Sequence, residues 1–300
     1  MLYLEELVDA VLIEEGQFLM GLSFVVDTLG LTMDKMNILF KKSMLEYARR
    51  RPIKATDIMS GNSYIVMPEG TLAVRAVRYG VLPELPRFYM DTFGDVGFEY
   101  DRTTRILKVW PPISPVKVTY DKGYTFSDLP VETYITQDED EDVIVDVLKC
   151  IPKKGSISIT KGDLSMSEVS RESKLVEDGG VPVKEHVVNL AGDLGTGKID
   201  LLNLEMELEL NDTSEGEIAI SYTPKYKAIF ELDIGDYVFT KLFACKMLEA
   251  LASLRAQATQ EALHQIDLTV DDLYSRVRIL KREVKELLRS TISFSGMFNI

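Results

Sequence analysis

The runs Met206-Glu207-Leu208-Glu209-Leu210 and Glu217-Ile218-Ala219-Ile220-Ser221-Tyr222 decide the fold of the middle of the chain. Apolar and polar side chains alternate in both, as in a strand with one buried face. Comparable runs begin at residues 143, 156 and 198, and glycines 155, 162, 192 and 216 punctuate them. Short strands between glycine turns are typical of a sandwich or barrel. We expect an all-β sandwich domain at 138–226, inserted between helical parts of the chain.

Residues 1 to about 51 have the period of helices. Apolar residues from Leu4 to Leu12, and again from Met36 to Tyr47, recur every three or four positions. Thr32 stands where an N-cap is expected, and Arg49-Arg50-Arg51-Pro52 ends the second run. Two helices joined by a short loop are predicted.

Residues 62–126 change to the period of strands. Residues 98–110 predict a hairpin with a polar tip, and Val116-Lys117-Val118-Thr119-Tyr120 alternates cleanly. Pro111, Pro112 and Pro115 confine the piece between them to a loop or a sheet edge. We expect a small antiparallel β unit.

The C-terminal part, residues 236–295, is expected to be helical. Thr269 and Asp272 form a capping-box-like start. A narrow apolar seam with nearly heptad spacing follows, flanked by charged residues. Residues of the seam and two charged neighbours are the interface candidates on this helix: Leu273, Val277, Leu280, Val284 and Leu287 in the seam, with Arg276 and Lys281 beside it. Ile292 would extend the seam. The seam packs either within its own protomer or against a neighbouring chain. The predicted fold class is therefore α+β, with 1–137 and 227–300 forming a helical and β core domain around the insertion.

One segment, Gly192-Asp193-Leu194-Gly195-Thr196-Gly197-Lys198-Ile199, has the glycine and lysine spacing of a phosphate-binding loop. Ile199 occupies the position of the magnesium-binding Ser or Thr, and the next residues alternate like a strand instead of starting a helix. A glycine-rich β-turn is the preferred interpretation.

Other candidates for chemistry are weak. His186 and His264 lack a second ligand at metal-binding spacing, and neither Cys150 nor Cys245 has a nearby base, so both cysteines are expected to be buried thiols. The acidic run at 138–142 lacks the central glycine and the final glutamate of a calcium loop, which favours a solvated linker. We predict no catalytic, cofactor-binding or metal-binding residue, and no enzyme activity.

Composition narrows the partners. With 46% hydrophobic and 27% charged residues the chain is globular, and its net charge of −14 disfavours nucleic acid as a primary ligand. The first 16 residues lack a basic region and a cleavage site, and no stretch approaches the roughly 18 apolar residues of a membrane span. We therefore expect a protein made in a reducing cytoplasm, with protein partners and no membrane association.

Two sets of motifs resemble virion proteins of tailed bacteriophages. The order of events in residues 1–126 is similar to the neck, or head-to-tail connector, proteins of contractile-tailed phages; it is carried by segments 47–52, 98–101, 106–111 and 116–120, together with Ala250-Leu251-Ala252-Ser253-Leu254-Arg255. A second set resembles a small β-sandwich module of phage tail, baseplate and neck proteins, in segments 151–160, 177–180, 195–200 and 216–222. Leu201-Leu202-Asn203 departs from that module, which has an aromatic residue there.

The resemblance implies a non-enzymatic subunit of the virion, assembled in the host cytoplasm. It would form a closed ring between portal and tail, with portal, tail terminator or other neck proteins as neighbours and double-stranded DNA passing through without specific binding. A baseplate or tail component is the alternative. A carbohydrate-binding protein is a third hypothesis, although residues 143–221 contain no Trp, Tyr or Phe to form a sugar-stacking platform.

Overall fold

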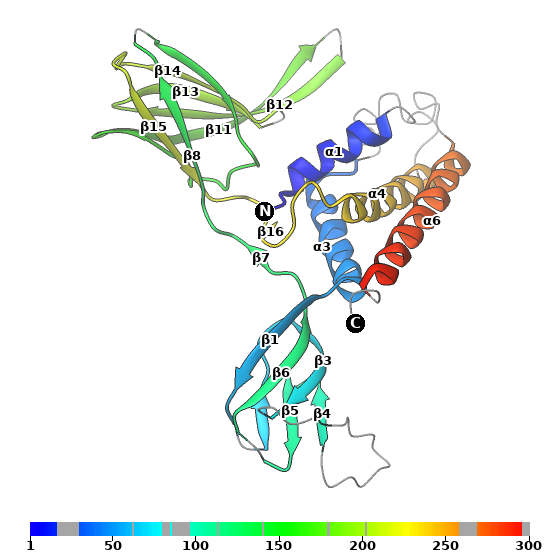
Figure 1. Ribbon diagram of the computed structural model, residues 1–300. Coiled ribbons are helices and arrows are strands. Elements are labelled where there is room, and N and C mark those ends of the chain that lie inside the picture. The colour runs from blue at the N-terminus through cyan, green and yellow to red at the C-terminus, as the bar shows by residue number, and fades with distance from the viewer. Residues whose placement is uncertain are drawn as a thin grey trace. The chain divides into compact units, whose positions relative to one another are not determined.

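The computed structural model combines helices with antiparallel sheets in two compact units (Figure 1). It describes residues 1–16, 30–61, 63–79, 85, 97–112, 114–139, 141–178, 181–201, 203–257 and 269–295. Unit 1 comprises Met1–Gln17 and Phe126–Ile234, and unit 2 comprises Phe18–Thr125 and Gly235–Ile300.

This division differs from the predicted one, because the N-terminal helix α1 (Leu4–Gly16) and residues 126–137 and 227–234 belong to the β-rich unit. Leu2 and Ile229 exchange backbone hydrogen bonds of 3.0 Å, and Tyr3 is part of the core of unit 1. Glu5 also accepts a hydrogen bond from the backbone N–H of Ile151. These contacts join positions far apart in the sequence, so local periodicity could not have revealed them.

Unit 1 is built on one eight-stranded antiparallel sheet, in the order β8-β15-β10-β11-β12-β13-β14-β9, which is nearly closed (Figure 1). Buried side chains from both end strands, such as Val131 and Ile144, share one hydrophobic core. The strands are β8 (Val131–Gln137), β9 (Val143–Val147), β10 (Ser158–Lys161), β11 (Leu164–Asp178), β12 (Val181–Gly192), β13 (Gly195–Asp200), β14 (Glu205–Leu210) and β15 (Gly216–Tyr222). A short pair, β7 (Phe126–Ser127) with β16 (Ala228–Ile229), completes the unit.

The strands predicted at 143, 156, 198, 206 and 217 are present within a few residues. The long β11–β12 hairpin was not predicted. Its outer part pairs only with itself, because β10 reaches no further along β11 than Ser167 and β13 no further along β12 than Val187. An arm of two strands therefore extends from the sheet (Figure 1).

Three helices of unit 2 pack together: α3 (Met33–Arg50), α4 (Tyr237–Gln257) and α6 (Val270–Ser295). The Thr32 side chain caps α3, and Thr269 and Asp272 form the predicted reciprocal cap of α6 with bonds of 3.1 and 3.2 Å. Asp236 caps α4 through the Phe239 N–H. Phe40 meets Phe239 and Phe243 edge-to-face at the centre, which is a favourable geometry for aromatic rings.

The β part of unit 2 consists of two three-stranded sheets, β1-β6-β3 and β2-β5-β4, with side chains in one shared core. The strands are β1 (Ile53–Met59), β2 (Tyr64–Val66), β3 (Thr71–Arg78), β4 (Gly97–Asp101), β5 (Ile106–Trp110) and β6 (Val116–Lys122). The predicted hairpin is β4–β5, in which the Thr103 N–H donates to the Asp101 carboxylate in the turn. Strands β1 and β3 escaped the sequence patterns.

Candidate interaction surfaces

The phosphate-loop-like segment is a tight hairpin, as predicted. Gly192 and Gly195 are the closing pair of β12 and β13, and Lys198 lies within β13. A Cβ on Gly192 would stand 2.2 Å from the Ser165 carbonyl oxygen, and one on Gly195 would stand 2.1 Å from that of Glu209. Only glycine fits at these two positions, because the backbone of neighbouring strands lies too close for a side chain. The glycine spacing is therefore explained by packing of the hairpin.

The cysteines and the described histidine do not form a reactive cluster. Cys150 and Cys245 are both buried, and burial is the main cause that raises the pKa of the Cys150 thiol. His186 is exposed on β12 and its Nδ1 lies 2.8 Å from the Ser173 hydroxyl. The other histidine, His264, lies outside the described residues.

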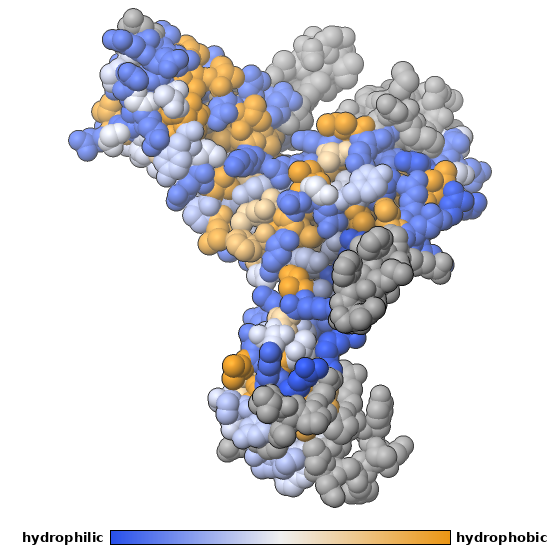
Figure 2. All heavy atoms as spheres, viewed as in Figure 1, coloured by the Kyte–Doolittle hydropathy of each residue, from blue (hydrophilic) through white to orange (hydrophobic). Residues whose placement is uncertain are grey.

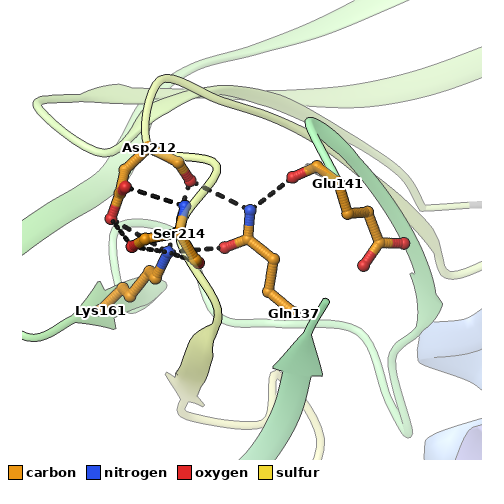
Figure 3. Close-up of polar contacts among 5 residues, drawn as sticks. All are labelled: Gln137, Glu141, Lys161, Asp212 and Ser214. Atoms are coloured by element: carbon orange, nitrogen blue, oxygen red, sulfur yellow. Dashed lines mark hydrogen bonds and ion pairs between the residues drawn. The ribbon is translucent and has the colours of Figure 1, made fainter. Parts of the chain in front are cut away.

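A buried lysine organises the loops at one end of the sheet in unit 1 (Figure 3). The Lys161 ammonium lies 2.8 Å from the Gln137 side-chain oxygen, 3.0 Å from the Asp212 carboxylate and 3.2 Å from the Ser214 hydroxyl. Gln137 in turn donates to the Glu141 carbonyl oxygen. Hydrogen bonding to Lys161 is the main cause that lowers the pKa of Asp212 to about 2.

In this network the Lys161 Nζ is surrounded by acceptor oxygens of Gln137, Asp212 and Ser214. A lysine acts as a base or nucleophile only when it is neutral, so the arrangement suits a structural tie better than catalysis. It joins β8, β10 and the β14–β15 loop, and it includes the end of the acidic run at 138–142. The described residues of that run form the loop between β8 and β9. This loop lies inside unit 1, so the predicted linker does not mark the boundary of the unit.

The predicted interface seam on α6 is directed into its own unit. Leu273, Val277, Leu280 and Val284 are buried, Leu287 and Arg276 are half-buried, and the exposed Lys281 forms an ion pair with Glu249 of α4. After Val284 the fully buried position moves to Leu288, because a straight helix drifts from a seven-residue repeat. The structure therefore supports the within-protomer alternative for these apolar residues. The Ile292 side chain is outside the described part.

Strands β9 and β14 expose two parallel rows on the outer face of unit 1. The valine row consists of Val143, Val145 and Val147, which are 42–63% exposed on the last strand of the sheet. The glutamate row consists of Glu205, Glu207 and Glu209, and the register places each glutamate directly opposite a valine. Exposed β-branched side chains on an end strand invite contact with another chain.

A mixed stripe runs along the outer face of α3. The α3 stripe consists of Ile38, Lys42, Leu45 and Arg49, whose spacing of four, three and four residues places them on one side of the helix. Ile38 and Leu45 are both 54% exposed. Next to the stripe, Arg50 and Lys246 share the Glu46 carboxylate.

An aromatic patch lies on the outer face of β2 and β5 in unit 2. Trp110, the only tryptophan of the chain, and Tyr64 are 52% and 64% exposed and line the same hollow. Lys108 and Glu99 form an ion pair of 3.5 Å in the same hollow. The sequence predicted the hairpin but not which of its faces is exposed.

Three signals in the sequence could have indicated these surfaces. The segment 143–147 is apolar at nearly every position, beside the strict alternation of 206–210. The α3 run contains apolar residues outside its buried stripe, and the lone tryptophan lies at the end of a strand. Each of these three signals is also expected for an element whose second face is buried. Only the fold shows that the second face is exposed.

No helix in the described part is long and apolar enough to cross a membrane. Nor do three or more His, Cys, Asp or Glu side chains converge as metal ligands among those residues. No protein-family model matches the chain, and no curated protein or solved structure matches it either. The fold and its surfaces thus define a mixed α and β protein with two units, each of which exposes apolar side chains among polar ones (Figure 2).

Proposed function

We propose that this chain is a non-enzymatic structural subunit that works by binding other protein chains. The observation that carries the proposal is the exposed valine row on the end strand β9. Removing such a row from water stabilises an assembly by roughly 25 cal/mol per Å² of apolar surface. The α3 stripe and the aromatic patch add two further surfaces whose exposed apolar groups favour contact.

The specific form we propose is a neck, or head-to-tail connector, subunit of a tailed-phage virion that assembles into a ring between portal and tail. The sequence motifs described above support this form. We also propose that unit 1 corresponds to the small β-sandwich module of phage tail, baseplate and neck proteins. Ring assembly requires two different complementary surfaces on each copy, and separate rows on the two units are consistent with that.

The proposal is tested by purifying phage particles from the cells that produce this protein, fractionating the particles into heads, necks and tails, and measuring the protein in each fraction by mass spectrometry. We expect it with head–tail junctions, and negative-stain images of the purified protein should show closed rings. Recovery only with isolated baseplates would favour the baseplate alternative. Absence from all particles would contradict a virion role.

A second candidate function is favoured by the aromatic patch. Exposed Trp110 and Tyr64 line one hollow beside an ion pair, and exposed aromatic side chains are common in sugar-binding surfaces. They lie in unit 2 and not in the β domain where the sequence hypothesis placed the site. Because Trp110 is the only tryptophan, its fluorescence reports directly on the patch. A saturable change on titration with oligosaccharides, lost in Tyr64→Ala, would support this function.

A further inference from the structure

The two units carry opposite net charges, which the total of −14 conceals. Unit 1 contains 29 acidic and 10 basic residues, and unit 2 contains 19 acidic and 24 basic residues. Their net charges are therefore −19 and +5. In a solution of identical copies, this asymmetry favours contact between unit 1 of one molecule and unit 2 of another.

The strongest local acidic feature of unit 1 is the glutamate row. Thr196 donates to Glu209, but within the described ranges neither Glu205 nor Glu207 forms an ion pair. Lys198 stands opposite Glu207 in the register and lines the same hollows as the three glutamates, but it does not approach any of them to ion-pair distance. The row thus presents a net negative charge beside exposed valines.

The basic counterpart in unit 2 is the α3 stripe and the hollows beside it. The hollows between α3, α4 and α6 are lined by six basic residues and only two acidic ones, Glu46 and Glu249; the basic residues are Lys42, Arg49, Arg50, Lys246, Lys281 and Lys285. Those two glutamates pair with Arg50, Lys246 and Lys281. In the described part of the chain, Lys42, Arg49 and Lys285 have no ion-pair partner.

The dimensions of the two surfaces also agree. Two steps of two residues along a strand separate Glu205 from Glu209 by about 13 Å, and seven residues along a helix separate Lys42 from Arg49 by about 10 Å. On each surface apolar side chains accompany the charges: valines beside the glutamates, and Ile38 and Leu45 among the basic residues.

We propose that the α3 stripe of one copy docks on the valine and glutamate rows of the next copy. This inference rests on the proposed function, in which the contact is the heterologous interface that closes the ring. It brings Lys42 and Arg49 onto the glutamate row, and it covers the valine row with Ile38 and Leu45. A helix face packed on a sheet face is a common way to bury both.

The test is a charge exchange in the full-length protein, followed by sedimentation velocity over a range of concentrations. Glu205→Lys/Glu207→Lys and Lys42→Glu/Arg49→Glu should each weaken assembly by about tenfold or more, because each creates like-charge contacts. Mixing the two variants should restore assembly. The reversed glutamate row of the first variant then faces the reversed α3 stripe of the second, so opposite charges meet again, and the two unmodified surfaces also meet. Glu132→Lys/Glu217→Lys, which changes the charge equally on exposed parts of β8 and β15, should assemble like the unmodified protein.

The outcomes separate the inference from the function it rests on. An oligomer that neither reversal weakens would overturn the docking surface while leaving a ring-forming subunit. A loss of assembly without restoration in the mixture would also overturn it. If Lys42→Glu/Arg49→Glu abolishes binding of a labelled DNA duplex while assembly is unchanged, the basic face serves nucleic acid and the proposal is wrong. An unmodified protein that stays monomeric would contradict both the inference and the ring.

Discussion

At the scale of single residues, the fold buries the carboxyl group of Glu5 and perturbs its pKa. Glu5 is 6% exposed, one oxygen accepts from the Ile151 N–H, and the other has no hydrogen-bond partner. Burial is the main cause that raises its pKa to about 7, with smaller contributions from Glu6 and Asp9. Ionised Glu5 therefore opposes the attachment of α1 to unit 1.

A falling stability between pH 4.5 and pH 7 is the expected consequence. In this interval the unfolded chain releases the proton before the folded chain does, so the free energy of unfolding decreases as pH rises, by at most about 3 kcal/mol. Glu5→Gln should remove this part of the pH dependence in urea unfolding, whereas Glu14→Gln, on the exposed side of α1, should keep it. An identical pH slope in wild type and Glu5→Gln would contradict the assignment.

Lys161 gives a second prediction at this scale. Lys161→Met removes the donor to the fully buried Gln137 oxygen and to the β14–β15 loop. An unsatisfied buried acceptor costs about 1–3 kcal/mol, so the free energy of unfolding of unit 1 should fall by that amount. The control is Lys153→Met, because the Lys153 side chain is exposed. Equal stability of the two variants would show that the network is not a structural tie.

At the scale of elements, the β12–β13 hairpin depends on a close approach of backbone. Gly192→Ala places a methyl group 2.2 Å from the Ser165 carbonyl oxygen, and backbone there cannot yield as a flexible side chain can. We expect a loss of stability of about 3 kcal/mol or more, at the upper end of overpacking costs. Gly155→Ala serves as the control: its Cβ has open space, and its φ of +71° costs only about 1–2 kcal/mol. Comparable chemical denaturation curves for the two variants would sink this explanation.

The sequence predicted those elements whose signals are local. The caps at Thr32 and Thr269, the β4–β5 hairpin and the glycine turn follow from residues a few positions apart. The pairing of Leu2 with Ile229 joins the two ends of unit 1, and the nearly closed sheet pairs strands that lie tens of residues apart, such as β8 with β15 and β9 with β14. The exposed side of β9 depends on the absence of a covering layer. Alternation predicts that a strand has a buried face, but a strand such as 143–147, apolar on both sides, leaves open which face that is.

At the scale of the whole molecule, the composition gives the total charge but not its distribution between the two units. The total charge predicted protein partners and disfavoured nucleic acid, but it averaged an acidic unit with a basic one. Only the division of the chain into units reveals that asymmetry, because unit 1 combines the N-terminal residues with the central strands. Docking between such units should weaken as salt rises from about 0.1 M to about 1 M, because exposed charges are then screened.

The mass of the purified protein in solution tests the central claim most directly. Light scattering on the full chain at low salt, over a wide range of concentrations, should give one discrete oligomer whose mass is a fixed multiple of 33.8 kDa. A mass of 33.8 kDa at every concentration would contradict the account, because the exposed rows would then have no partner among copies of this chain.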